Sequence, residues 1–149
     1  MATIRLPTDF KEFLRLLNSG GVKYLIVGGY AVAFHGHPRA TGDLDIWVAI
    51  SPQNAARVRQ VLIDFGFPES PVASAPLHLE GQVIRMGRPP LRIELLTSVS
   101  GVVFDECYPR RETQTIDGVE VPFLSRPDLL TNKRAAGRAQ DAADLDRLA

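Results

Sequence analysis

A short apolar strand that runs directly into two glycines most constrains what this chain can form. The apolar run Tyr24–Val27 is typical of a strand, and it stops at Gly28-Gly29, where the backbone must bend without a Cβ. A short apolar helix is predicted at residues 30–34. Its first free N–H groups would lie where the chain leaves the strand, and helix N-termini of this kind are suited to phosphate.

A strand with alternating carboxylates follows at residues 41–48, with the sequence TGDLDIWV. Successive side chains of a strand point to opposite faces, so Asp43 and Asp45 would share one face, about 6.6 Å apart along the strand. Like charges at this separation repel each other unless a cation is bound between them. Proteins usually hold Mg²⁺ with one or two carboxylates and the substrate phosphates. We therefore predict that the glycine turn binds phosphate and that Asp43 and Asp45 bind the metal.

This order of glycine turn, helix and D-x-D strand resembles the nucleotidyltransferases of the DNA polymerase β superfamily. The resemblance is greatest to a small bacterial branch that includes abortive-infection toxins and other toxin-like nucleotidyltransferases, and it covers most of the chain. It rests on VGGYAVAFHG, an R-x-T segment and DLD. Gly28, Gly29, Asp43 and Asp45 match the core motif. The resemblance implies that the third carboxylate, on a neighbouring strand, is Glu94, at a position that is often Asp.

The resemblance also implies a reaction. Asp43, Asp45 and Glu94 would be the catalytic and metal-binding residues of a Mg²⁺ site, which in such enzymes holds one or two metal ions. Gly28 and Gly29 would present backbone N–H groups to the triphosphate of an NTP. The expected activity is transfer of an NMP to a hydroxyl group, with Glu94 helping to deprotonate that hydroxyl.

Each part of the motif also has a purely structural interpretation. Gly28-Gly29 suits any tight turn from strand to helix, and the two aspartates suit an exposed strand edge or a helix cap. Glu94 lies in an otherwise apolar strand, where a buried carboxylate is costly unless it is paired or metal-bound. Its alternative is an outward-facing residue paired with Arg92 or Arg85. The three features together favour a catalytic site.

Arg39 and Thr41, which precede the D-x-D strand, are further candidates for nucleotide binding. Arg39 suits a triphosphate, through its forked guanidinium, and equally a structural contact with Asp43. Thr41 either contributes to the nucleotide site or only starts the strand. His35 and His37 lack the spacing of zinc ligands and are expected to be structural or solvent-facing.

The C-terminal segment at residues 132–145 resembles the closing K-x-x-a-x-R-x-x-D-x-x-D element of the same family. The resemblance implies that Lys133 and Arg138 contact phosphates or the acceptor from the side opposite the metal. The alternative is a solvated helix pair in which Arg138 forms a salt bridge with Asp141 or Asp144, which would add little stability.

Composition limits the class of protein. The 149 residues contain 17 Lys plus Arg and 17 Asp plus Glu, so no overall basic field attracts nucleic acid. The length fits a single domain at residues 1–149. Cys107 is the only cysteine, which excludes an internal disulfide and a cysteine-based zinc site and fits a reducing cytoplasm. Residues 1–7 lack the apolar core of a signal peptide and no run is long enough to span a membrane, so we expect a cytoplasmic protein.

Local signals predict the flanking helices. Thr8 is expected to cap a helix at residues 9–18. Ser51, followed by Pro52, is expected to start another that ends at Gly66.

Strand signals follow in the second half of the chain. Residues 82–86 and Leu91–Leu96 are predicted strands, and residues 68–81 a loop that could lie over the site. Asp117-Gly118 is predicted to be a hairpin turn. The expected fold is α/β of the α+β type, with a nucleotidyltransferase-type mixed β-sheet, flanking helices and a short helical tail at about residues 125–149.

The sequence therefore predicts a Mg²⁺-dependent nucleotidyltransferase that uses ATP or another NTP. Its acceptor is open among a tRNA end, a protein hydroxyl and a small molecule, and neutral net charge disfavours a large RNA. If the protein belongs to the toxin-like branch, it would also bind an antitoxin protein. The contrasting hypothesis is a nucleotide-binding or partner-binding module that kept the fold and lost turnover, which Glu94 in place of Asp favours and the intact Gly-Gly and DLD motifs disfavour.

Overall fold

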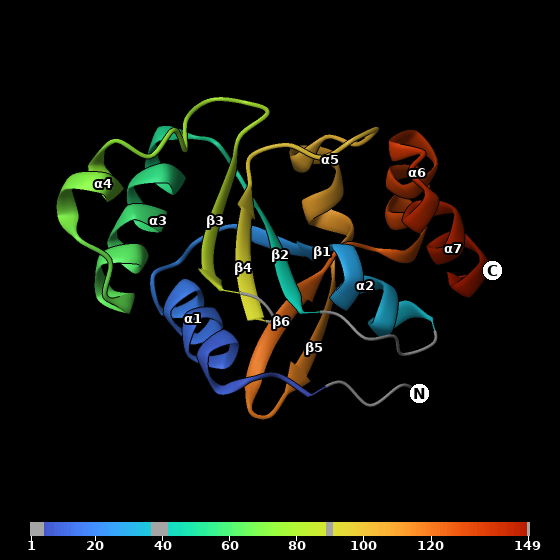
Figure 1. The fold of residues 1–149 in the computed structure, drawn as a ribbon, viewed down its shortest axis with the longest axis horizontal. Helices are drawn as coiled ribbons and strands as arrows, with labels where there is room; N and C mark the ends of the chain where they lie inside the picture. The colour runs from blue at the N-terminus through green and yellow to red at the C-terminus, as the bar shows by residue number, and fades with distance from the viewer. Residues whose placement is uncertain (1–4, 37–41, 89–90, 149) are drawn as a thin grey trace.

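The computed structural model describes residues 5–36, 42–88 and 91–148, and folds them around a six-stranded sheet (Figure 1). The strand order is β3-β4-β2-β1-β6-β5. In chain order the elements are α1 (Thr8–Ser19), β1 (Tyr24–Val27), α2 (Gly28–His35), β2 (Asp43–Val48), α3 (Pro52–Phe65), α4 (Glu69–Ala73), β3 (Val83–Arg88), β4 (Leu91–Leu96), α5 (Phe104–Cys107) with a 3₁₀ turn (Tyr108–Arg110), β5 (Glu112–Ile116), β6 (Val119–Phe123), α6 (Arg126–Ala136) and α7 (Ala139–Leu148).

The sheet is mixed, and its register aligns the acidic residues. Strand β2 pairs antiparallel with β1 and parallel with β4, so Asp45 lies between Val27 on one side and Glu94 on the other. Strand β3 pairs antiparallel with β4, and β6 pairs parallel with β1 and antiparallel with β5. The predicted mixed sheet with flanking helices is therefore confirmed.

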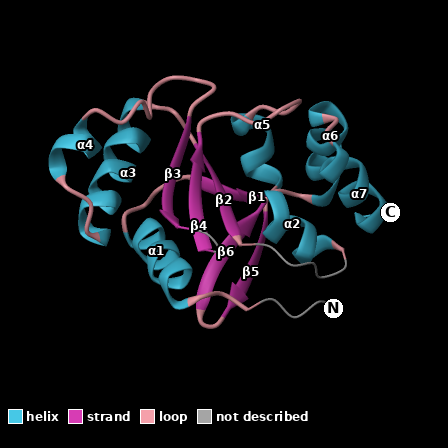
Figure 2. Ribbon diagram, in the orientation of Figure 1, coloured by secondary structure: helices cyan, strands magenta, loops and turns pink. Residues whose placement is uncertain are grey.

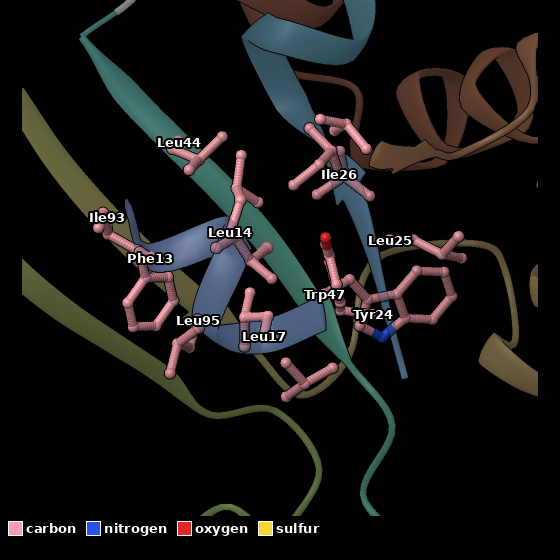
Figure 3. Packing of buried hydrophobic residues seen from close by; sticks show 14 of the residues in the cluster. Phe13, Leu14, Leu17, Tyr24, Leu25, Ile26, Leu44, Trp47, Ile93 and Leu95 are labelled. Carbon is pink, nitrogen blue, oxygen red and sulfur yellow. The ribbon is translucent and has the colours of Figure 1, made fainter. Parts of the chain in front are cut away.

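Helices cover both faces of the sheet (Figure 2). On one face, Phe13, Leu14 and Leu17 of α1 belong to a buried cluster with Leu44 of β2 and Leu95 of β4 (Figure 3). The opposite face is bordered by α2, α5, α6 and α7. Because side chains alternate along β2, Asp43, Asp45 and Trp47 all point toward this second face.

Several local predictions are confirmed. Ser51 caps α3 by accepting a hydrogen bond from the Asn54 N–H at 3.2 Å, and Gly66 ends this helix in the left-handed conformation. Asp117 and Gly118 have φ values of 50° and 80°, as the predicted hairpin turn requires. The predicted helical tail is present as α6 and α7, and the assignment of residues 1–149 to one domain stays a prediction.

Other local predictions are wrong. Thr8 lies inside α1 and does not cap it, because Pro7 occupies the cap position and makes no side-chain hydrogen bond. Helix α2 begins at Gly28 rather than at residue 30. Residues 69–73 form α4, which packs against α3 and not over the acidic face. Among the helices described, none combines the length and apolar character needed to cross a membrane.

Asn54 of α3 fastens this helix to the ends of β1 and β2. Its side-chain amide donates to the carbonyl oxygens of Lys23 at 3.0 Å and Ala49 at 2.8 Å, and its Oδ1 accepts from the Lys23 N–H at 2.7 Å. The side chain is buried, so water does not replace these partners if they are lost. The buried amide thus fixes the point at which β2 leaves the sheet.

We predict that Asn54→Ala lowers the free energy of unfolding by about 3 kcal/mol, because three buried hydrogen bonds to backbone groups are lost. Urea denaturation of both proteins measures the change. Gln60→Ala on the same helix is the control: Gln60 is exposed and its side chain donates to the Asp64 carboxylate, so its loss should cost less than about 0.5 kcal/mol. Equal losses for the two variants would contradict the role given to Asn54.

Candidate active site

A cavity of about 310 Å³ lies where β1, β2 and β4 meet α6. Five residues predicted from the sequence line it: Gly28, Asp45 and Glu94 on the side of the strands, and Lys133 and Arg138 on the side of the C-terminal helices. The residues that line it are Val27, Gly28, Asp45, Glu94, Leu96, Ser98, Val99, Ser100, Asn132, Lys133, Ala136 and Arg138.

Gly28 is required at the mouth of α2 for two independent reasons. Its φ is +67°, a conformation that other residues rarely adopt. A Cβ at this position would lie 2.1 Å from Oδ2 of Asp45, well inside van der Waals contact. The glycine therefore lets the Asp45 carboxylate approach the backbone at the start of the helix. Gly29 is buried behind it and is not among the residues that line the cavity.

Asp45 and Glu94 face the cavity from neighbouring parallel strands, at paired register positions. Burial, the charge of Glu94 and a hydrogen bond between the two carboxyl groups raise the pKa of Asp45 to about 7. The charge of Asp43 acts in the same direction, and Lys133 opposes it. The Oδ1 atom of Asp45 is buried without a hydrogen-bond partner among the described residues. A bound cation would therefore reduce the repulsion between the carboxylates and give the Asp45 oxygen a partner.

Two arginines hold the outer carboxylates. The Arg92 guanidinium donates to both oxygens of Asp43, at 3.3 and 3.2 Å, and Asp43 is not among the residues that line the cavity. The Arg85 Nε donates to Glu94 Oε1 at 3.1 Å, while the Glu94 side chain is only 14% exposed. Glu94 thus faces the cavity, as the catalytic hypothesis expects, and it also forms the ion pair with Arg85 that the structural alternative expects.

The residues present fit a hard divalent cation. Within the described ranges, no three acidic, histidine or cysteine side chains already form a metal-binding group, because Asp43 is drawn towards Arg92. Asp45 and Glu94 nevertheless bring carboxylate oxygens to one cavity, and one of these oxygens is buried and unpaired. Carboxylate oxygens are the ligands that Mg²⁺ prefers.

Lys133 enters the cavity wall from α6 and is almost fully buried. Its Nζ lies 3.1 Å from Asp141 Oδ1 and 3.1 Å from Asp144 Oδ2, and both aspartates are completely buried on α7. The alternative of a solvated helix pair is therefore wrong for the two aspartates. Its expected ion pair does form, since Arg138 Nε donates to Asp141 Oδ2 at 2.7 Å.

The charge on Asp141 is maintained by its partners. Burial alone would raise its pKa, but hydrogen bonds from Arg138 and Lys133 outweigh burial and lower the pKa to about 2. Asp141 therefore stays ionised beside the buried Lys133 side chain. Arg138 itself remains largely exposed, with a side-chain accessibility of 73%.

Four further candidates from the sequence remain, and the structure adds one residue that was not predicted. Arg39 and Thr41 lie outside the described residues, as does His37. His35 is structural, as predicted: its Nε2 lies 2.7 Å from the carbonyl oxygen of Leu124. Asn132 lines the cavity and donates to the Ser100 carbonyl at 2.9 Å, and sequence reasoning missed it although it directly precedes Lys133.

Comparison with known families agrees with this geometry. The model of the family described as nucleotidyl transferase of unknown function (DUF2204) matches residues 7–149. The chain belongs to this family. The predicted assignment to the nucleotidyltransferases is thereby confirmed, and the protein is an enzyme of the nucleotidyltransferase class.

Two solved structures have a similar fold. The lincosamide antibiotic adenylyltransferase LnuA in its lincomycin-bound form gives a TM-score of 0.62 at 15% identity, over 96% of each chain. An antigenic nucleotidyltransferase-like protein from Paracoccidioides brasiliensis gives 0.50 at 18% identity, over 96% of this chain and 75% of that one. At these identities the likeness is one of fold. No curated protein matches the chain significantly.

We predict that Gly28→Ala destabilises the nucleotidyltransferase by at least about 3 kcal/mol, through backbone strain and the clash with Asp45. Transfer activity should also fall at least about a hundredfold, because the carboxylate is displaced. Gly21→Ala is a matched control, since Gly21 has the same φ of +67° with no atom within 4 Å of a Cβ. It should cost about 1 kcal/mol and leave activity unchanged. Urea denaturation and pyrophosphate release measure the two effects, and equal behaviour of the variants would refute the contact.

We predict that Lys133→Met lowers the free energy of unfolding by about 3–5 kcal/mol, since it removes the buried ammonium that contacts both buried carboxylates. Lys11→Met is the control. Lys11 lies 4.0 Å from the half-exposed Asp117, a surface pair worth less than about 1 kcal/mol. Thermal or urea denaturation distinguishes them, and a loss below about 1 kcal/mol for Lys133→Met would show that the three buried charges are not coupled.

Proposed function

We propose that this nucleotidyltransferase transfers an NMP from an NTP, with Mg²⁺, to a hydroxyl group of a small molecule. The observation that carries the proposal is the position of Asp45 opposite Glu94 in one cavity, directly against the glycine that starts α2. Asp43 lies two residues before Asp45 on the same strand face and completes the acidic set.

The nucleotide would be bound between the two sides of the cavity. The free N–H groups at the start of α2, which begins at Gly28-Gly29, suit the phosphates. Lys133 contributes a fixed positive charge from the opposite wall. The Arg138 guanidinium donates to Asp141 through Nε and Nη2, at 2.7 and 3.3 Å, but its side chain is 73% exposed, so its remaining N–H groups can bond a phosphate oxygen. Arg39 and Thr41 remain proposed contacts of the triphosphate.

The acceptor oxygen forms a bond to the α-phosphorus while the bond from that phosphorus to the pyrophosphate oxygen breaks. The hydroxyl proton passes to Glu94, the carboxylate of the cavity that lies beside Asp45. Asp43, Asp45 and Glu94 would hold Mg²⁺, which when bound neutralises charge on the phosphates and lowers the pKa of the attacking hydroxyl. Positioning and electrostatic stabilisation therefore account for catalysis without a covalent enzyme intermediate.

Two observations support a small-molecule acceptor. The protein shares its fold with an enzyme named as a lincosamide antibiotic adenylyltransferase over nearly the whole of both chains. Its net charge is zero, which provides no general attraction for RNA. A tRNA end, a protein hydroxyl, and a toxin role with an antitoxin partner in the cytoplasm are the other outcomes of the acceptor test.

A second candidate function is a nucleotide-binding module without turnover. It is favoured by the contacts of Arg85 with Glu94 and of Arg92 with Asp43, because both carboxylates are already paired. Incubation with α-labelled and γ-labelled NTPs and Mg²⁺ separates the two functions. Release of pyrophosphate with transfer of the α-label supports the enzyme, whereas saturable binding without release supports the module. Label recovered in RNA or protein would refute the small-molecule acceptor.

We predict that Asp45→Asn abolishes transfer, with a fall of at least about a hundredfold, while the free energy of unfolding is unchanged or higher. Its neutral amide no longer repels Glu94, so the metal-free fold loses a strained charge. Pyrophosphate release and urea denaturation measure these effects. Glu12→Gln, an exposed change on α1, is the control and should alter neither. Activity of Asp45→Asn within a few-fold of wild type would refute the assignment.

Glu94 is expected to behave differently from Asp45 in binding. Glu94→Gln removes the proposed base, so kcat should fall by about 10²–10⁴ while the affinity for NTP changes little. Glu94→Asp keeps the carboxylate and should retain substantial activity. Steady-state kinetics and equilibrium NTP binding test this pair, and equal activity of the two variants would contradict a role for the carboxylate charge.

A further inference from the structure

A second cavity, of about 460 Å³, lies beside Trp47, which is two residues after Asp45 on β2. Trp47 lines it and points to the same face as Asp45, about 6.6 Å along the strand. The register repeats this step on β4, where Leu96 pairs with Trp47 as Glu94 pairs with Asp45. Ser98 lines both cavities, so the second is a direct neighbour of the first.

The walls of the second cavity are suited to an apolar or ring-containing body. The rings of Trp47 and Phe104 meet edge to face, with centroids 5.1 Å apart. Val48 lies beside them, and Val103 is 58% exposed at the mouth. Its volume is within the range of roughly 300–1,000 Å³ that is usual for small-molecule sites.

One residue that lines this cavity carries a buried polar group without a hydrogen-bond partner among the described residues. Within the described part of the chain, the Trp47 indole N–H makes no hydrogen bond, although the residue is only 2% exposed. A buried donor without a partner is costly, and most buried donors in proteins are paired. An oxygen atom of a bound molecule would satisfy it, so the cavity is suited to an amphipathic ligand.

The charged residues of this cavity indicate the charge of its ligand. Glu80 and Asp105 line it together with Lys23, which leaves one net negative charge. The Lys23 ammonium lies 5.8 Å from the centroid of the Tyr108 ring, a contact outside the set of cavity residues. This balance favours a cationic ligand and disfavours the polyanionic nucleotide.

We propose that this second cavity binds the acceptor, and that the acceptor is a small amphipathic amino alcohol; the proposal rests on the function proposed above. The apolar body packs on Trp47 and Phe104, an oxygen accepts from the indole N–H, and the protonated amine lies near Glu80 and Asp105. The hydroxyl then extends toward Asp45 and Glu94. Its oxygen bonds the α-phosphorus, its proton passes to Glu94, and pyrophosphate leaves.

Trp47 is the only tryptophan of the chain, so its fluorescence reports directly on this cavity. The experiment titrates the whole protein, without nucleotide, with phenylalaninol and with 3-phenylpropan-1-ol, which lacks the amine. We expect a saturable change in emission with both, and tighter binding of phenylalaninol. Asp105→Asn should weaken phenylalaninol binding about two- to fivefold and leave the neutral alcohol unaffected. Glu106→Gln, the same charge change at an exposed neighbour outside the cavity, should alter neither.

A transfer assay with α-labelled NTP, Mg²⁺ and phenylalaninol completes the test. Label on phenylalaninol, with a KM for it that Asp105→Asn raises and a KM for NTP that it does not, supports the proposal. An unchanged Trp47 emission, or equal effects of Asp105→Asn and Glu106→Gln, overturns it. Saturable quenching by NTP alone, with competition by the alcohols, also overturns it and assigns the cavity to the base. Binding of phenylalaninol without transfer of label to it overturns the acceptor role of this cavity. The function proposed above fails by a different result, namely that no NTP is turned over with any acceptor.

Discussion

The contact between Gly28 and the Asp45 carboxylate is the constraint on which the rest of the site depends. It requires β1 to pair antiparallel with β2 in the register that sets Val27 beside Asp45, and it requires a left-handed backbone at Gly28. The same turn starts α2, so the first free N–H groups of that helix lie beside the carboxylate. A phosphate-binding helix end and an acidic side chain would normally be poor neighbours for one anionic substrate. Their proximity makes sense where a cation is shared between them.

Charge balance around the cavity is divided between its two sides. On the strand side the carboxylates outnumber the cations that reach into the cavity. Glu94 forms an ion pair with Arg85, and Asp43 forms one with Arg92. On the helical side, Lys133 is locked between Asp141 and Asp144, which together exceed its charge, and Arg138 restores the balance from the surface. Burial makes the contacts of Lys133 with Asp141 and Asp144 stronger than they would be in water. The cavity is thus strained only at Asp45, where a buried oxygen lacks a partner within the described residues.

Features that depend on neighbouring residues in sequence were predictable. The two-residue period of β2 places Asp43 and Asp45 on one face, β4 has the predicted bounds Leu91–Leu96, and Asp117-Gly118 needs only its own backbone to form the turn. Features that depend on register were not. Nothing local distinguishes Arg92 as the partner of Asp43, which follows from β2 and β4 pairing in parallel. The burial of Asp141 and Asp144 was also missed, because a polar helix is expected to be solvated until its lysine partner on another helix is known.

The C-terminal helices α6 and α7 pack against α2, the helix that starts at the cavity, so the shape of the cavity depends on the docking of this helical tail. Helix α7 contacts α2, the helix that begins at Gly28, and a Cβ on Gly36 would lie 2.7 Å from the Arg147 carbonyl oxygen. Arg126 at the start of α6 bonds the carbonyl oxygen of Leu148 at the end of α7. Lys133 of α6 lines the cavity while its ammonium contacts Asp141 and Asp144 of α7. Undocking of the tail would therefore remove the cationic wall while leaving the six-stranded sheet and its carboxylates in register. Asp45 would then lose the favourable charge of Lys133 that opposes its protonation, so the acidic strand and the helical tail stabilise each other through the cavity that they share.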